Sequence, residues 1–487
     1  MEKIIVRSIY SIIFLIITFI ISICLIWSKN NSLIGIIVMS VLIAMMICIN
    51  KVLSKLENSL SCKAVNIIFA ASMVLIVVIQ LITASKLAVF PSWDFEIVYN
   101  QAVRLAENPS APISEYFAKY PNNIGLLYIL AKAFRVSNIL NIKHYLRCGI
   151  ILNIVFVDFS IIFMYLSCKK LFGKKECVIF CILSIMFIPY YIYMPIIYTD
   201  TIAMFFVAAV VYLFADFIKA EANKRKILYL IMIGIAAAWG FKIKATIAIL
   251  LVAVMIYMII RLAVNRKNLL IQALSIIILI SSFIGASKAT NYVINKSIYI
   301  PDEMYFEYKV PYEHWIMMGL KGVGFYDPYD VVFSKNSGNY DQKKAAEIKV
   351  IKERLNNYGS YGLLKHIIKK SVFTWDDGSY YAIPLLTNSI KTSGLHQLFT
   401  YKGKYYNVYH YYSYGYHLML LCLLLIPIIK RIRDPELDSE LMLYMAFTGL
   451  ILFLFMWENT PRYVLHFMGI AILLSAKSIV SINRKRK

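Results

Sequence analysis

The chain has 487 residues, of which 60% are hydrophobic and only 16% are charged, whereas an average soluble domain is about 45–50% apolar and about 25% charged. So much apolar surface excludes an ordinary soluble globular protein. The net charge of +24 does not indicate nucleic-acid binding, because the basic residues form short clusters between apolar runs and not one continuous stripe.

Apolar runs of about 18 residues or more recur along the chain and are long enough to cross the roughly 30 Å hydrocarbon layer as helices. The first run follows Lys3 and Arg7. It lacks a small-residue cleavage site and precedes further spans, so it is predicted to be an uncleaved anchor. About twelve spans are predicted in all, and the fold class is an all-α polytopic membrane protein. The predicted spans start near Ser8, Ser32, Ala64, Tyr145, Glu176, Thr201, Ile227, Ala245, Asn268, Tyr409, Ser439 and Arg462.

Basic clusters between these spans predict the orientation of the chain, since cytoplasmic loops carry an excess of Lys and Arg. If the N-terminus is cytoplasmic, every cluster falls inside and both termini lie in the cytoplasm. All six tryptophans then lie at or beyond the outer ends of spans, a depth that aromatic rings favour. The clusters are Lys51, Lys55 and Lys63; Lys169, Lys170, Lys174 and Lys175; Lys219, Lys224, Arg225 and Lys226; Arg261, Arg266 and Lys267; Lys430, Arg431 and Arg433; and Arg484 to Lys487.

The predicted location is the plasma membrane. This topology divides the chain into four predicted parts. They are two N-terminal helices (1–63), a membrane module with a long exported loop at 85–144 (64–285), a mixed extracytoplasmic segment (286–410), and C-terminal helices with a basic tail (411–487). All eight cysteines lie in spans or at their cytoplasmic edges, so neither a disulfide framework nor a zinc site is predicted.

Helical spacing predicts short helices inside both exported segments. In the first segment two helices are separated by Asn108–Pro112, and the second of them runs from about Asn123 to Phe134. In the second segment an amphipathic helix around Ile348–Leu355 is followed by another at about Tyr361–Lys370. Such helices are typical of a membrane surface.

Two carboxylates, Asp94 and Glu96, stand just outside the third predicted span. A carboxylate held at the membrane face can take the proton of an attacking hydroxyl. Residues two apart on a helix point to different sides, so only one of them can be the base unless the turn is irregular. Asp94 is the first candidate for the base, and Glu96 is predicted as a catalytic residue beside it. The alternative is a structural role in the first turn of a helix capped by Ser92, where acids are favoured.

Three charged residues from two other places are predicted at the same outer face. Asp200 begins the sixth span, and Lys242 and Lys244 occupy a tight turn between two spans. Acids at this depth usually point into a cavity, and lysines that break the inside rule need an anion, for which a phosphate is the natural candidate. A helix cap and interfacial snorkelling are the alternatives.

The short outer turn between the last two spans holds Glu458 and Arg462. A guanidinium is planar and always charged, so Arg462 suits a bidentate phosphate contact, with an ion pair to Glu458 as the alternative. Arg147 opens the fourth span and is either a further phosphate ligand or a snorkelling side chain.

Acids and cations from four separated places thus converge on one membrane face. When a sugar leaves a lipid phosphate, the phosphate gains negative charge that cations must neutralise, while a carboxylate deprotonates the acceptor. The pattern therefore predicts a glycosyltransferase that uses a polyprenyl-phosphate sugar.

The pattern resembles the GT-C superfamily of polytopic glycosyltransferases, in particular the protein O-mannosyltransferase and aminoarabinose-transferase-like family (glycosyltransferase family 39). Besides the charged residues above, Tyr120-Pro121-Asn122-Asn123-Ile124-Gly125-Leu126-Leu127-Tyr128 and Ile243-Lys244-Ala245-Thr246 carry the resemblance, which covers about 65–270 and the last two spans.

The resemblance implies a GT-C transmembrane module with Asp94 as catalytic base, Asp200 assisting, and Lys244, Arg147 and Arg462 holding the donor phosphate in an inverting displacement. Two extra spans before the catalytic loop, and Tyr-Pro-Asn-Asn in place of a Pro-Pro pair, depart from the family pattern and leave the acceptor open.

Further residues are candidates for the acceptor side or for support of the site. Asp376 and Asp377 could bind the acceptor or a divalent cation, although a surface turn is the alternative. Glu458, Tyr120 and Trp375 complete this group.

The implied partners are the lipid-linked donor, membrane lipids and a wall polymer, lipid-linked glycan or protein as acceptor. A transporter, flippase or polymerase of lipid-linked glycans is the rival interpretation. A transporter would be expected to show internal repeats and polar breaks near the bilayer midplane.

Overall fold

The computed structural model describes residues 2–28, 32–56, 60–264 and 269–482. Arg266, Lys267, Asn268 and the basic tail Arg484 to Lys487, which entered the predictions above, lie outside the described residues.

The described part of the chain is helical, and nine of its helices are long and apolar enough to cross a membrane. Their first residues lie within a few residues of the predicted starts at most places. These helices are α1 (Glu2–Ile26), α2 (Ser32–Lys55), α3 (Cys62–Lys86), α7 (Tyr145–Leu171), α10 (Thr199–Lys219), α11 (Asn223–Ile243), α12 (Ala248–Val264), α13 (Leu269–Ser297) and α20 (Tyr406–Arg433). The all-α polytopic class is confirmed.

The other three predicted spans are shorter helices, so the count of twelve full-length spans is not reached among the described residues. They are α8 (Lys174–Met186), α21 (Glu440–Met456) and α23 (Met468–Ile482). The helix α8 ends early because Pro189 lies close behind it, and proline cannot continue an α-helix hydrogen-bond ladder.

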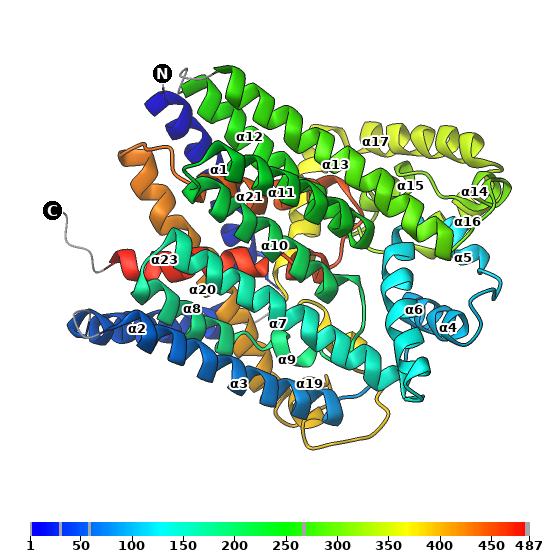
Figure 1. The fold of residues 1–487 in the computed structure, drawn as a ribbon, viewed down its shortest axis with the longest axis horizontal. Helices are drawn as coiled ribbons and strands as arrows, with labels where there is room; N and C mark the ends of the chain where they lie inside the picture. Colours follow the sequence, from blue (N-terminus) through cyan, green and yellow to red (C-terminus); the bar gives the residue numbers. More distant parts are fainter. Residues whose placement is uncertain (1, 29–31, 57–59, 265–268, 483–487) are drawn as a thin grey trace.

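The remaining helices gather mostly at one end of the bundle, and both termini lie towards the other end (Figure 1). They are α4 (Trp93–Glu107), α5 (Glu115–Lys119), α6 (Ile124–Ile139), α14 (Asp302–Tyr308), α15 (Glu313–Gly319), α16 (Pro328–Asn336), α17 (Tyr340–Trp375), α18 (Ala382–Leu385) and α19 (His396–Phe399). Short pieces complete the fold, namely η1 (Pro121–Asn123), α9 (Pro189–Ile192), η2 (Ala245–Ile247) and α22 (Arg462–Leu465).

The predicted short helices are present. Helices α4 and α6 stand on either side of the Asn108–Pro112 break and pack against each other. The two predicted amphipathic helices are joined in α17, which is kinked at Gly359, where φ is 55°. Glycine tolerates that left-handed conformation and therefore marks the junction.

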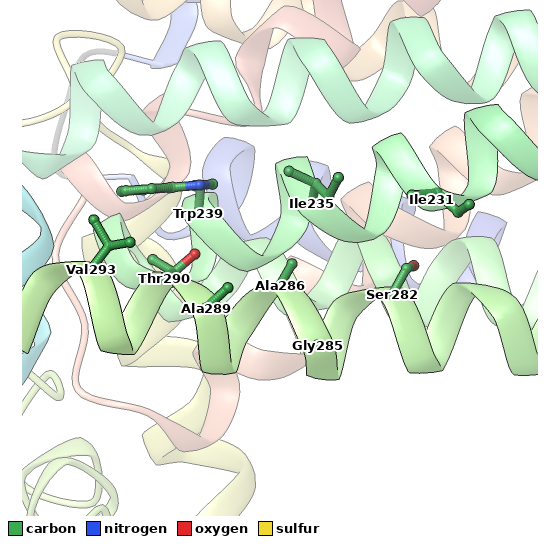
Figure 2. A pocket seen from close by; sticks show the side chains of 9 residues that line it. All are labelled: Ile231, Ile235, Trp239, Ser282, Gly285, Ala286, Ala289, Thr290 and Val293. Carbon is green, nitrogen blue, oxygen red and sulfur yellow. The ribbon is translucent and has the colours of Figure 1, made fainter.

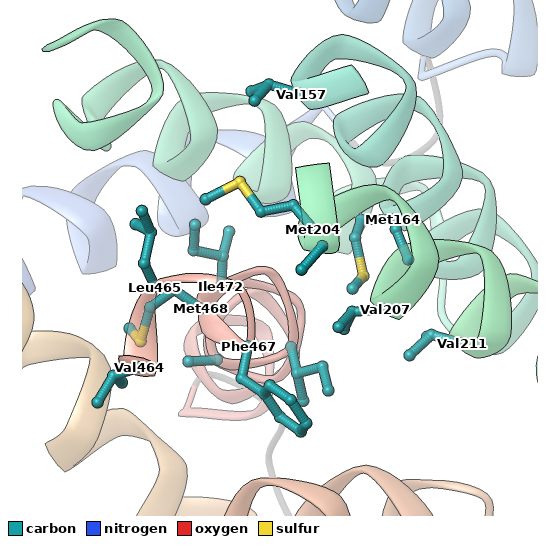
Figure 3. Packing of buried hydrophobic residues seen from close by; sticks show 14 of the residues in the cluster. Val157, Met164, Met204, Val207, Val211, Val464, Leu465, Phe467, Met468 and Ile472 are labelled. Atoms are coloured by element: carbon teal, nitrogen blue, oxygen red, sulfur yellow. The ribbon is translucent and has the colours of Figure 1, made fainter. Parts of the chain in front are cut away.

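The centre of the bundle is built from α7, α10, α20 and α23. Met164 of α7, Val207 of α10, Phe467 just before α23 and Met468 at the start of α23 belong to the core there (Figure 3). This packing joins the middle of the chain to its C-terminal end.

The stretch between α8 and α10, in which only the short piece α9 is helical, crosses this interior, although backbone groups inside a membrane bundle must all find hydrogen-bond partners. Side chains of other helices supply them. Gln80 donates to the Tyr190 carbonyl at 3.2 Å, and Asn153 donates to the Tyr193 carbonyl at 3.1 Å. The stretch therefore stays ordered and delivers Tyr198 and Asp200 to the end of the bundle.

Candidate functional site

Three predicted site residues meet at the end of the bundle where the short helices gather. Asp200 lies in the first turn of α10, Lys244 follows the last residue of α11, and Arg462 begins α22. Lys244 forms an ion pair with Asp200 Oδ1, and Arg462 Nη1 lies 3.7 Å from Asp200 Oδ2. The Asp200 side chain is only 2% exposed, so one buried carboxylate holds two cations from distant parts of the sequence.

Aromatic rings enclose the Arg462 guanidinium. Its Cζ lies 5.3 Å from the ring centre of Trp93 and 5.0 Å from that of Tyr198. Lys244 Nζ lies 4.5 Å from the ring centre of Tyr463. Such cation–π contacts stabilise a charge where water is scarce. Nevertheless, Arg462 Nη1 is buried and has no hydrogen-bond acceptor among the described residues.

Asp94 lies on the other side of Tyr198. The Tyr198 hydroxyl is 3.1 Å from Asp94 Oδ2 and 3.2 Å from Asn123 Oδ1, and it can donate to either. Asn123 Nδ2 in turn donates to the Tyr116 hydroxyl at 2.6 Å. Burial, together with the charge of Asp94, raises the pKa of Tyr116, which lies in the short helix α5. Asp94 therefore belongs to a hydrogen-bonded group that shares Tyr198 with Arg462.

The backbone before Asp94 is strained. Trp93 has φ of 47°, in the left-handed region that a bulky residue rarely adopts. Ser92 is the N-cap residue of α4 and both acids lie in the first turn, as the structural alternative supposed, although the Ser92 side chain makes no cap hydrogen bond. Strain of this kind costs about 1–3 kcal/mol and tends to occur at functional sites.

Glu458 completes the group from the turn before α22. It is buried and accepts a hydrogen bond from the Tyr463 hydroxyl at 3.1 Å. Arg462 has Asp200 and not Glu458 as its carboxylate partner within 4.0 Å, so the structural ion pair considered above is not formed. Burial raises the pKa of Glu458, and Arg462 opposes this rise.

Tyr120 lies close to the same group. Burial raises the pKa of the Tyr120 hydroxyl, and the nearby charges of Asp94 and Glu458 add to this rise. It follows α5 and precedes η1, the element that ends at Asn123.

Three other predicted residues lie apart from this cluster. Glu96 and Arg147 are exposed, on α4 and α7. The Lys242 side chain is half-buried, and its backbone carbonyl faces α6, where a Cβ added at Gly125 would lie 2.2 Å from that oxygen. Gly125 thus permits α6 to approach the end of α11.

The turn at Trp375, Asp376 and Asp377 is not on the surface. Trp375 is 1% exposed and Asp376 is 8% exposed, which corrects the surface-turn alternative. Asp377 accepts hydrogen bonds from the backbone N–H groups of Ser379 at 2.8 Å and Tyr381 at 2.7 Å. These bonds stabilise a turn in which both Tyr380 and Tyr381 have positive φ, so Asp377 supports the backbone there.

No group of three or more His, Cys, Asp or Glu side chains that could hold a metal ion occurs in 2–28, 32–56, 60–264 and 269–482. The charged groups that do converge are three carboxylates, Asp94, Asp200 and Glu458, with the cations Lys244 and Arg462 beside them. This set is suited to binding an anion and accepting a proton.

An apolar groove of about 440 Å³ lies between α11 and α13 (Figure 2). Trp239 and Ile235 of α11 form one wall, and Gly285, Ala286 and Ala289 of α13 form the other. Trp239 stands three residues before Lys242, which is less than one helical turn. The groove therefore runs towards the cationic end of α11.

A family model matches residues 3–482 of the chain, and its description is "conserved hypothetical integral membrane protein". The chain belongs to this family. It is thus an integral membrane protein, as predicted. No curated protein matches the sequence.

Solved structures with a similar arrangement include the oligosaccharyltransferase AglB of Archaeoglobus fulgidus, in complex with an inhibitory peptide and a dolichol-phosphate. It is 13% identical with a TM-score of 0.44, and the match covers 84% of this chain and 50% of that one. The A. fulgidus oligosaccharyltransferase tethered with an acceptor peptide is 14% identical with a TM-score of 0.46 and coverages of 84% and 49%. The chain thus spans about half the length of these two proteins.

ArnT of Cupriavidus metallidurans, bound to undecaprenyl phosphate, is 10% identical with a TM-score of 0.34, and the match covers 86% of this chain and 78% of that one. AglB and ArnT are GT-C superfamily glycosyltransferases, the superfamily named by the sequence resemblance.

Five neutral residues of the cluster carried no predicted role in the site, namely Trp93, Tyr116, Asn123, Tyr198 and Tyr463. Tyr198 connects Asp94 to Arg462, and Asn123 connects Tyr198 to Tyr116. In the sequence Tyr198 stands two residues before Asp200, and Asn123 stands two residues after Pro121. Neutral side chains give no charge signal, so their roles emerge only from the contacts.

Proposed function

We propose that the chain is a membrane glycosyltransferase that moves a sugar from a polyprenyl-phosphate donor to an extracytoplasmic acceptor. The observation that supports this most directly is the Arg462 guanidinium, which lies between aromatic rings with a buried Nη1 that lacks an acceptor. A buried polar donor without a partner is costly. A phosphate oxygen of the donor would satisfy it.

In the proposed reaction the acceptor hydroxyl attacks the anomeric carbon while the bond from that carbon to the phosphate oxygen breaks. The bonding electron pair leaves on the phosphate, where Lys244 and Arg462 stabilise the added charge. Asp94 takes the proton of the acceptor hydroxyl. The products are the glycosylated acceptor, with inverted configuration, and the free polyprenyl phosphate.

Asp200 has a different proposed role from Asp94. Because it already pairs with Lys244 and lies near Arg462, it orients the two cations and is poorly placed to accept a proton. Asp94 receives only neutral hydroxyl contacts in the described structure. The two acids are therefore divided between orientation and proton transfer.

The groove between α11 and α13 supports the lipid part of the proposal. Its walls are almost wholly apolar, and α13 is largely unburied within the protein. We propose that the isoprenoid chain of the donor lies along this groove, so that the phosphate reaches the cations beyond Trp239.

We also propose that this end of the bundle faces away from the cytoplasm. Both termini lie towards the opposite end (Figure 1), and the basic clusters of the predicted cytoplasmic loops support the orientation. A topology reporter inserted after Pro91 is expected to be extracytoplasmic. A cytosolic reporter at this position would refute the proposed orientation.

The decisive experiment follows transfer from a panel of radiolabelled polyprenyl-phosphate sugars in membranes that contain the wild type, Asp94→Asn or Glu96→Gln. We expect one donor to be consumed by the wild type and by Glu96→Gln, since Glu96 is exposed. Loss of the general base should slow Asp94→Asn by about 10²–10⁴-fold.

Equal consumption by the wild type and Asp94→Asn would remove Asp94 from the role of base. If the wild type consumed no donor of the panel but moved a lipid-linked glycan across the membrane, the chain would instead be a flippase.

A further inference from the structure

The helix α17 supplies an unusual set of donors to the end of α15. Its Arg354 donates to the Met317 carbonyl, Tyr358 donates to the Leu320 carbonyl at 2.9 Å, and His366 contacts the Gly319 carbonyl at 2.9 Å. The last carbonyls of a helix have no partner within it. The end of α15 is therefore fixed by side chains of α17.

Lys370 of α17 also donates to the end of α15, and in addition it contacts the turn before α22. Its Nζ donates to the Gly319 carbonyl at 2.8 Å and to the Trp457 carbonyl at 2.5 Å, and the residue is 1% exposed. Trp457 directly precedes Glu458 in the turn that carries Arg462. One buried ammonium group thus joins α15 to the site turn.

The backbone of that turn makes further contacts with the same unit. The Glu458 N–H donates to the Trp315 carbonyl at 2.8 Å, and the Asn459 N–H donates to the Gly324 carbonyl at 2.6 Å. Asn459 Nδ2 donates to the backbone carbonyl of Lys370 at 3.1 Å. The indole rings of Trp315 and Trp457 stack with centres 5.7 Å apart.

We infer that Lys370 is a positioning residue for the reaction proposed above, because it holds the Trp457 carbonyl and thereby fixes the turn that carries Glu458 and directs Arg462 towards Asp200. This inference rests on the proposed function. A lysine suits the position because its ammonium has three donors on a flexible stem and can reach two carbonyls at once. Lys370 itself does not touch the site that would hold the donor.

The electrostatics of the position agree with this role. Burial lowers the pKa of Lys370 to about 7, while the facing carboxylate of Glu458 opposes this lowering. His366 is its titratable neighbour on α17, and Lys370 in turn helps to lower the pKa of His366, for which burial is the main cause. The proton on Lys370 is therefore exchanged near neutral pH.

The test compares Lys370→Met, Lys370→Arg and Lys369→Met. Lys369 is the adjacent lysine and is exposed, which makes it a matched control. Binding of undecaprenyl phosphate in detergent and sugar transfer are both measured. We expect Lys370→Met to weaken binding about fivefold and to lower kcat at least tenfold, whereas Lys369→Met stays within twofold of the wild type.

The pH profile separates positioning from a general loss of structure. The alkaline limb of kcat in the wild type is expected to begin near pH 7 and to move to higher pH in Lys370→Arg, because a guanidinium stays protonated. This comparison of Lys370→Arg with the wild type tests the inference even if Lys370→Met fails to fold. An unshifted limb in a folded Lys370→Arg would overturn the inference.

Other outcomes distinguish the two levels of the proposal. If Lys370→Met binds and transfers like the wild type while Asp94→Asn is inactive, the positioning role is wrong and the proposed function stands. If the wild type neither binds undecaprenyl phosphate nor transfers any sugar, both the function and this inference fall.

Discussion

Helices α10 and α13 have similar apolar composition but occupy opposite environments. Of the most apolar stretch in each, 83% of the residues in α10 are buried inside the protein, but only 6% of those in α13 are. Both are acceptable in a membrane, because lipid tails and a protein interior are about equally apolar. Hydrophobicity therefore identifies both as spans but does not tell which one carries the chemistry.

Removing a charged side chain should give the largest difference in stability between variants of α10 and variants of α13. Asp200→Asn, at the start of α10, leaves Lys244 and Arg462 without their carboxylate, and breaking a buried pair typically costs about 3–5 kcal/mol. Lys288→Met, on an exposed position of α13, should change stability by less than about 0.5 kcal/mol. Thermal unfolding in detergent measures both. Similar melting temperatures for the two variants would break the comparison.

Shortening apolar side chains should give the next largest difference. Phe214 of α10 is fully buried, with its ring centre 5.2 Å from that of Tyr257, so Phe214→Ala should cost about 3–5 kcal/mol. Ile277 of α13 is 57% exposed, and Ile277→Ala should cost less than about 1 kcal/mol. Unfolding by a denaturing detergent gives the two values. Equal losses would mean that α13 packs against something in the membrane.

The smallest expected effect concerns the groove face of α13. Ala286→Trp should fill the space opposite Ile235 and raise the KM for the donor lipid about tenfold, or about 1.4 kcal/mol. Ile284→Trp, which adds a ring at an exposed position outside the groove lining, serves as its control. The melting temperature should stay unchanged in both. An unaltered KM in Ala286→Trp would place the lipid elsewhere.

The sequence predicted the site best at charged residues, because a charge near a membrane is costly and needs a physical reason. Asp94, Asp200, Lys244 and Arg462 each occupy positions that are unfavourable or conspicuous near a membrane, and they do come together with Glu458. Their catalytic roles remain predictions. Glu96, also a predicted catalytic residue, is exposed on α4 and lies apart from this group.

Other features depended on the rotation and tilt of helices, which periodicity does not determine. Arg147 could have faced the cluster or the surroundings of α7, and it is exposed. Lys370 was predicted to lie on an amphipathic surface helix, but the partner α15 covers it. A basic residue beside apolar neighbours has the same pattern whether lipid headgroups or backbone carbonyls receive its hydrogens.

The long separation between Asp200 and Arg462 also has a consequence for biosynthesis. The ribosome releases α10 into the membrane long before α22 and α23 are synthesised. Until then the Asp200 carboxylate has at most Lys244 as an ion-pair partner, because Arg462 does not yet exist. The end of α8 likewise lacks the partner that Tyr412 later supplies, whose hydroxyl donates to the Met186 carbonyl at 2.8 Å. Interrupted translation before the last helices would leave a chain that is inserted in the bilayer but still lacks an assembled pocket.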